Sequence, residues 1–158
     1  MIARQAQIED WNGLKACWHS LKDSRHAWKI HGDEAVLRSY FSLSLVHPVF
    51  GVLVLVDDST GEVHGFAVLQ ECVNSSMDTS GQGMVNEPHS FIRALYVKSG
   101  TAPEHSAMLE SEMKNWAIRR NHLYLCGNCR ADFPDRFAKL YGYEVSHVVV
   151  KKSLKEVR

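Results

Sequence analysis

The sequence predicts a mixed α/β domain in which a mostly antiparallel sheet carries helices on both faces. One observation is a pair of apolar runs, residues 52–56 and 63–69, joined by turn-forming residues 57–62. Both runs are apolar on both faces, which is typical of a sheet covered on its two sides. The other observation is the alternation of strands with segments of helical periodicity, in a chain of 158 residues that suits one domain spanning 1–158.

Two helices are predicted before this hairpin. After a short strand over residues 2–7, Asp10 has the character of an N-cap for a helix over 11–23. Asp33 likewise precedes a second helix, over 34–46, which Pro48 ends. The apolar residues of each helix recur at helical spacing: Trp11, Leu14, Trp18 and Leu21 in the first, and Val36, Leu37, Tyr40, Phe41 and Leu45 in the second.

The second half of the chain continues the alternation. Residues 74–90 are polar and predict a long loop, which is either a mobile segment or a lid over a substrate. A buried strand over 91–97 follows, then a glycine turn, a helix that runs to about Arg120 and a strand over 123–126. Pro134 and Gly142 bracket a short late helix, and residues 144–151 form the last predicted strand.

The composition narrows the classes of function. Eighteen basic and eighteen acidic residues give a formal net charge of zero with the histidines neutral. Neither a nucleic-acid partner nor a membrane surface is therefore expected. The first residues lack the apolar segment of a signal peptide, and no apolar run approaches the length of a membrane span, so we expect a cytoplasmic protein.

The four cysteines include one closely spaced pair, Cys126 and Cys129. A C-x-x-C pair is compatible with half of a zinc site or with a redox pair. A closed zinc site needs two more ligands, and Cys17 and Cys72 lie far away in the sequence. We therefore expect structural thiols and no metal site, with a metal or thiol sensor as the less favoured alternative.

The most informative stretch is the strand over 91–97 together with the turn and helix that follow it. The first turn of a helix leaves backbone N–H groups without partners and carries partial positive charge. A strand that delivers the chain directly into such a turn makes a seat for a phosphate-bearing cofactor. The sequence therefore indicates anion binding at the start of this helix.

Three segments carry a wider likeness. They are residues 61–69 with Gly65-Phe66-Ala67, Leu95-Tyr96-Val97 followed by the helix start at 106–110, and residues 137–144 with Gly142-Tyr143. In this order they resemble the GNAT superfamily of acyl-CoA-dependent N-acyltransferases over nearly the whole chain. The resemblance implies a GNAT-like sheet and transfer of an acetyl group from acetyl-CoA to an amine by direct attack. The implied acceptor is a small-molecule or protein amine, and a homodimer is compatible with it.

The resemblance also implies where acetyl-CoA binds. In that family a bulge separates the fourth strand from the fifth, the pantetheine arm lies between them, and the pyrophosphate meets the start of the third helix. On this chain the arm would follow Leu95, Tyr96 and Val97. The phosphates would meet the turn and helix start that come next, at Gly100, Thr101, Ala102, His105, Ser106 and Ala107.

The phosphate loop departs from the family pattern of Arg or Gln, two residues, Gly, one residue and then Gly or Ala. Here Ala102 stands at the first position and His105 at the glycine position. Thr101 and Glu104 also fit a capping box, which would occupy amides that a phosphate needs. These departures favour an alternative, a catalytically inactive GNAT-like domain that serves as an interaction or structural module.

Acyl transfer needs a neutral amine and a proton for the leaving thiolate. Many family members have a tyrosine four residues before the late glycine, where this chain has Ala138. Tyr141, one turn onward on the same face, is the candidate acid, with packing against the sheet as its other interpretation. Glu71 and His89 are the candidate bases, because the fourth strand itself offers Arg93 rather than a carboxylate.

Overall fold

The computed structural model describes residues 1–23, 34–72, 76–77, 84–85, 88–122 and 124–127. All of them belong to one compact unit, Met1–Gly127. The predicted cap at Asp33, the late helix with Pro134 and Gly142, and the strand over 144–151 lie outside the described residues.

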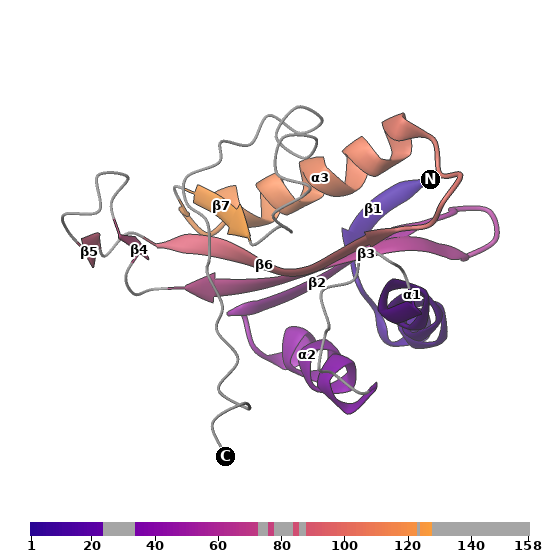
Figure 1. Ribbon diagram of the computed structural model, residues 1–158, viewed down its shortest axis with the longest axis horizontal. Helices are drawn as coiled ribbons and strands as arrows, with labels where there is room; N and C mark the ends of the chain where they lie inside the picture. The colour runs from indigo at the N-terminus through magenta and orange to yellow at the C-terminus, as the bar shows by residue number, and fades with distance from the viewer. Residues whose placement is uncertain (24–33, 73–75, 78–83, 86–87, 123, 128–158) are drawn as a thin grey trace, which may run out of the picture. The chain divides into compact units, whose positions relative to one another are not determined.

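A five-stranded sheet forms the centre of this unit, with the strand order β1-β2-β3-β6-β7. The first four strands pair antiparallel and β7 joins β6 in parallel, so the sheet is mixed and mostly antiparallel, as predicted (Figure 1). The strands are β1 Ile2–Gln5, β2 Phe50–Val56, β3 Val63–Cys72, β6 His89–Val97 and β7 Tyr124–Gly127. The α-helices are α1 Trp11–Asp23, α2 Glu34–Val46 and α3 Pro103–Ile118, with a 3₁₀ turn, η1, at Ile8–Asp10.

The predicted loop over 74–90 contains regular structure. Ser76–Met77 (β4) and Met84–Val85 (β5) pair as a short antiparallel ladder, and β6 begins already at His89. The loop prediction is therefore wrong at both of these places. Strands of two residues are too short to show the alternation of apolar and polar residues by which a strand is predicted.

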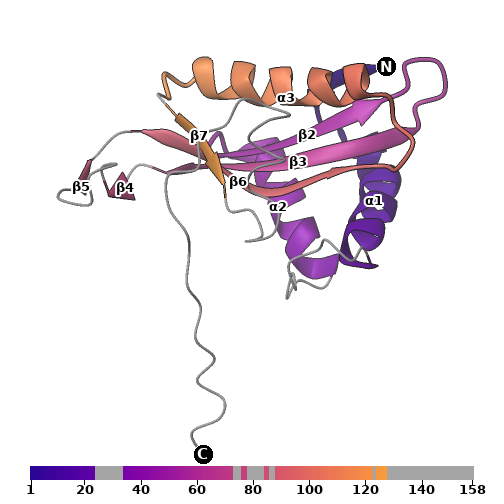
Figure 2. The same ribbon diagram turned by 45° about the horizontal axis from the view of Figure 1, so that its top comes forward.

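The sheet is covered on both faces, which confirms the prediction from the two apolar runs. Helices α1 and α2 lie on one face and α3 lies on the other (Figures 1 and 2). Val52 and Val54 of β2 pack toward α1 and α2, while Leu53 and Leu55 pack toward α3, and all four are fully buried. Among the described helices, none has both the length and the apolar character needed to cross a membrane.

Asp10 links the first strand to the first helix. Its carboxylate accepts the Gln7 amide at 2.7 Å and two hydrogen bonds from the Arg4 guanidinium, at 2.6 and 2.9 Å. These hydrogen bonds with Asp10 raise the pKa of Arg4. The sequence predicted an N-cap for α1, but Asp10 ends the 3₁₀ turn η1 and its carboxylate faces back to β1. A two-point contact of this kind fixes the angle at which the chain enters α1.

Gly51 of β2 lies directly against the indole of Trp116 in α3. A Cβ at this position would lie 2.5 Å from Nε1 and 2.6 Å from Cε2 of Trp116. The glycine therefore lets the buried indole lie flat against β2.

We predict that Gly51→Ala lowers the free energy of unfolding by about 1–3 kcal/mol, because the methyl group displaces Trp116 from a packed core. Urea denaturation measures this change. In a Trp116→Leu background the same substitution should cost less, since the smaller side chain leaves space for the methyl group. An equal cost in both backgrounds would show that the indole is not what the methyl group meets.

Candidate functional site: the free edge of β6 and the start of α3

A one-residue bulge interrupts β6. Val68 of β3 pairs with Ala94, and the next residue, Leu69, pairs with Ile92. Arg93 is therefore the extra residue on β6, and it has no partner in the ladder. A bulge of this kind bends the strand and changes its twist locally.

In the described part of the chain, the pairing of β6 with β7 reaches as far as this bulge. The parallel register runs from His89 with Tyr124 to Ile92 with Gly127. Beyond it, residues 94–97 pair with β3 on one side, and within the described residues no strand covers their other side. This free edge is about 13 Å long at 3.3 Å per residue. It offers backbone N–H and C=O groups to an extended ligand.

Side chains of the free edge contribute packing rather than polar groups. Leu95 and Val97 pack toward α3, whereas Ala94 and Tyr96 pack toward α1 and α2. The Tyr96 ring lies 6.2 Å from the ring of Phe66, centroid to centroid. Leu95, Tyr96 and Val97, the residues predicted along the pantetheine arm, thus lie on the free edge. They offer a ligand their backbone groups and not their side chains.

A tight turn connects this edge to α3. The Thr101 amide donates to the Lys98 carbonyl at 3.2 Å, and Gly100 has a φ of 86°. Glycine is needed here because a side chain would be strained at this positive φ. The turn carries the chain from the end of β6 directly into the first turn of α3.

The start of α3 differs from the predicted capping box, which is wrong. Its N-cap is Ala102, which makes no side-chain cap hydrogen bond, and Pro103 occupies the first turn. Thr101 is therefore one residue too early to cap, and its Oγ1 is a buried oxygen without a partner. Within the described chain, the amides of Ala102 and Glu104 meet no acceptor. Within the described residues, two amides and one hydroxyl at the helix start thus have no hydrogen-bond partner.

Other groups at the helix start are engaged. The amides of His105 and Ser106 donate to the Ala102 carbonyl at 3.0 and 3.3 Å, and Ser106 Oγ donates to the Pro103 carbonyl at 2.8 Å. Lys98 donates to Glu62 at 2.7 Å, which is the main cause of the lowered pKa of Glu62. The charges nearest the turn are thus largely compensated, and the exposed Glu104 adds a negative charge to it.

The two predicted bases lie on opposite faces of the sheet. Glu71 is on the α3 face, where its Oε1 lies 3.4 Å from His122 Nε2. His89 pairs in the ladder with Cys72, the residue that follows Glu71 in β3. Its side chain is buried, with 7% of its surface exposed. The structure does not bring these two side chains together. Tyr141, the predicted acid, lies outside the described residues.

A buried polar group that the sequence did not reveal lies beside Glu71. Ser90 Oγ is 2.6 Å from His122 Nδ1, and His122 packs edge-on against Trp116. Ser90 and the His122 side chain are fully buried and cannot meet a substrate, whereas the Glu71 side chain is 25% exposed. Together the three residues tie the end of α3 to β3 and β6. No periodic pattern marks His122, because it follows Asn121 at a left-handed turn with φ 56°.

The cysteines of the described chain form no metal site. Within that part, no three of the His, Cys, Asp and Glu residues are placed to hold a metal ion. Cys17, Cys72 and Cys126 are free thiols there, and Cys129 lies outside the described residues. Burial raises the pKa of Cys126 to about 11, and the neighbouring Cys72 adds to the shift.

We predict that iodoacetamide modifies Cys126 slowly in the folded protein. With a pKa of about 11, the thiolate fraction at pH 8 falls on the order of 100-fold below that of an ordinary cysteine. Peptide mapping by mass spectrometry at pH 8 compares the native protein with the same peptide in urea. Equal rates in the two states would contradict the buried, protonated thiol and would favour a reactive one.

No protein-family model matches the sequence, and no curated protein sequence matches it. Solved structures do match. An aminoglycoside 6'-N-acetyltransferase from Acinetobacter haemolyticus has a TM-score of 0.74 at 15% identity, over 98% of this chain and 99% of that one. The aminoglycoside N-acetyltransferase AAC(6')-Iy in complex with CoA has a TM-score of 0.75 at 15% identity, over 97% and 93%. Glucosamine-6-phosphate N-acetyltransferase from Arabidopsis thaliana has a TM-score of 0.68 at 11% identity, over 97% of each chain. The chain therefore has the fold of the GNAT superfamily of N-acetyltransferases.

Proposed function

We propose that this protein is an N-acetyltransferase that uses acetyl-CoA and acetylates the amine of a small molecule. The observation that carries the proposal is the free edge of β6, which ends in a turn and a helix start with available amides. An extended, amide-containing arm with phosphates at one end fits such a path. The fold neighbours that bind CoA or act on aminoglycosides and glucosamine 6-phosphate support the same activity and the same class of acceptor.

The described residues fit acetyl-CoA in a definite order. The backbone of residues 94–97 would pair with the amides of the pantetheine arm. The amides of Ala102 and Glu104 would donate to the pyrophosphate. Thr101 Oγ1, buried and without a partner, would gain one there as well. The roles of Gly100, His105, Ser106 and Ala107 stay predictions.

The chemistry is a transfer between two groups held side by side. The amine nitrogen forms a bond to the acetyl carbon, the carbon–sulfur bond breaks, and the proton lost by the amine ends on the CoA sulfur. The chain holds the two reactants in line and offers a backbone amide of the free edge, at its end near the bulge, to the thioester oxygen. Tyr141, Glu71 and His89 keep the proposed proton-transfer roles that the sequence suggested.

Isothermal titration calorimetry with acetyl-CoA tests the proposal. We expect binding in the micromolar to millimolar range that is weakened by salt, because the phosphates carry most of the charge. Absence of heat at millimolar ligand would reject the transferase assignment. The inactive interaction module would then be the better interpretation of the same fold.

We predict that Glu104→Gln tightens acetyl-CoA binding a few-fold. Glu104 is exposed near the start of α3, so its repulsion of a phosphate is screened but present. Calorimetry at low salt measures the change. Glu112→Gln, on the same helix and two turns further on, is the matched control and should leave the affinity unchanged. Equal effects of the two substitutions would place the phosphates elsewhere.

We also predict that acetyl-CoA slows amide hydrogen exchange over residues 94–104. The free edge and the helix start lose their contact with water when a ligand bonds to them. The turn between β2 and β3, residues 57–62, should exchange at the same rate with and without ligand. Protection that avoids β6 altogether would contradict the proposed path, even if calorimetry detects binding.

A further inference from the structure

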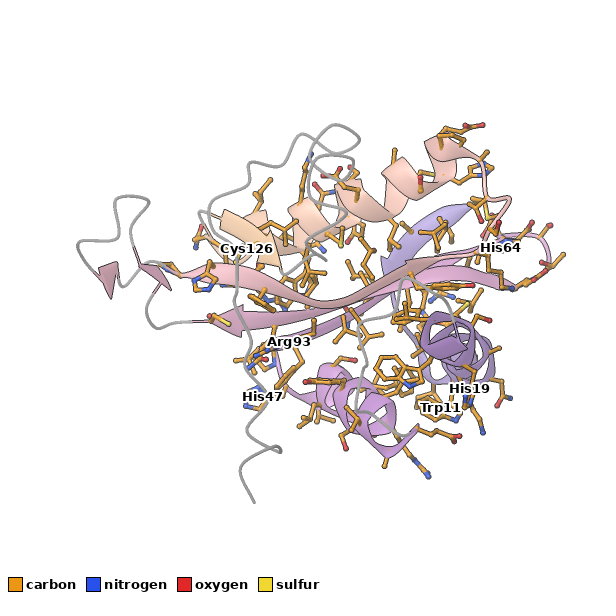
Figure 3. All side chains as sticks on the ribbon, viewed as in Figure 1. Trp11, His19, His47, His64, Arg93 and Cys126 are labelled. Carbon is orange, nitrogen blue, oxygen red and sulfur yellow. The ribbon has the colours of Figure 1, made fainter. Side chains whose placement is uncertain are left out.

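Arg93, the bulge residue, has an ordered guanidinium group. Its Nε donates to Gln70 Oε1 at 2.7 Å, and its Cζ lies 4.8 Å from the centroid of the Phe91 ring. Gln70 and Phe91 are themselves partners in the β3–β6 ladder, so the two supports come from one rigid place in the sheet. The side chain lies on the face that α2 covers, as His47 does (Figure 3).

Among the described residues, the outer side of this guanidinium has no partner. Both supports use the Nε edge and one face of the plane, which leaves Nη1 and Nη2 to donate outward as a fork. In the described part of the chain neither Nη nitrogen meets a carboxylate. Arg4 and Arg119, by contrast, donate to Asp10 and Glu112. An exposed arginine that is fixed in place and lacks an acidic partner is suited to an anionic ligand.

Among the described strands and α2, no carboxylate competes with Arg93 on its face of the sheet. Glu71 is the one acidic residue in β2, β3 and β6, and it faces α3 beside His122. Glu34, the one acidic residue of α2, lies 2.9 Å from Lys15 and 3.7 Å from His19. Along these described elements, the α2 face at the bulge is therefore positive. A cationic acceptor would find repulsion there instead of a counter-charge.

The position of Arg93 relative to the free edge suggests a role for its positive charge in the reaction. This inference rests on the proposed function. With the phosphates at the start of α3 and the arm along residues 94–97, the thioester lies toward the bulge. Arg93 is then the charged side chain next to the reacting end. A guanidinium is a hydrogen-bond donor with no acceptor atom, so Arg93 is suited to binding an anion and not to taking a proton from the amine.

We propose that Arg93 binds an anionic group of the acceptor, a carboxylate or a phosphate, and so directs the neighbouring amine to the thioester. The two Nη donors match two oxygens of either anion. The acceptor class is therefore an amine that also carries a negative charge, such as an amino acid or a phosphorylated amino sugar. Polycationic amines are excluded by the same charge.

Release of free CoA from acetyl-CoA measures this preference with five named acceptors. They are a mixture of the twenty amino acids, the matching mixture of amino-acid amides, glucosamine 6-phosphate, glucosamine, and the polycation neamine. We expect turnover with one anionic set to exceed that with its neutral match by about tenfold or more. Faster turnover of the amino acids than of their amides indicates that Arg93 binds a carboxylate. Faster turnover of glucosamine 6-phosphate than of glucosamine indicates that it binds a phosphate. Equal or faster turnover with the neutral or cationic amines overturns the proposal.

Variants of Arg93 locate the effect. Arg93→Gln should raise KM for the anionic acceptor about tenfold or more, leave the neutral match unchanged and leave the affinity for acetyl-CoA unchanged. Arg93→Lys should restore part of the loss, since it keeps the charge without the fork. Arg119→Gln, at the C-cap of α3, is the matched control with the same loss of charge. Equal effects of Arg93→Gln on anionic and neutral acceptors would overturn the proposal.

The two proposals fail in different ways. No acetyl-CoA binding by calorimetry rejects the transferase activity itself, whatever Arg93 does. Acetyl-CoA binding with no turnover of either anionic set rejects the role of Arg93 and leaves the cofactor path standing. Circular dichroism and urea denaturation confirm that each variant is folded before its kinetics are compared.

Discussion

The one extra residue in β6 is the constraint on which the candidate site depends. Within the described residues, the parallel ladder with β7 runs up to Ile92, next to the bulge, and no strand pairs with the other side of residues 94–97. The strand is held by β3 throughout, so the free side is rigid rather than frayed. One backbone irregularity thus produces both an edge for a ligand and an ordered arginine at its far end.

The two faces of the sheet differ in the polar and charged side chains that they carry. On the α3 face, Leu53, Leu55 and Trp116 form an apolar cluster, and the Trp116 ring contacts His122, which joins buried Ser90 to the partly exposed Glu71. On the other face, Gln70 near the end of β3 and Phe91 near the start of β6 are half-buried. The charged side chain beside them is the exposed Arg93. Glu71 pairs with Ser90, and His89 pairs with Cys72 in the next pair of the ladder. Because successive pairs of a ladder alternate between the two faces, Glu71 and His89 lie on opposite faces of the sheet.

Much of the fold was predictable because it depends on apolar periodicity. The bounds predicted for α1 and α2 agree with the structure, and the hairpin of β2 and β3 follows from two runs that are apolar on both faces. The short strands β4 and β5 were missed, since no apolar pattern marks them. The bulge at Arg93 was not located from the residues either, because register is a property of two strands and neither strand shows it alone.

The candidate site was predictable in position but not in detail. Leu95, Tyr96 and Val97 do lie on the free edge, and Thr101 and Ala102 do stand at the start of α3. The capping box at Thr101 and Glu104 failed because the helix starts one residue later than the motif requires, with Ala102 as the N-cap. A motif read from side chains cannot decide where the backbone turns. The contact between Ser90 and His122 joins positions 32 residues apart and was equally invisible.

The free edge of β6 has a consequence for how such proteins diverge. Peptide groups are the same in every residue, so a groove made of them tolerates almost any sequence that keeps the bend in the strand. Selection then acts on the geometry of the backbone, and most amino acids along the strand can be substituted. Chains that retain this architecture can therefore lose all recognisable kinship in their sequences, while a single charged side chain at the bend changes which molecules they accept.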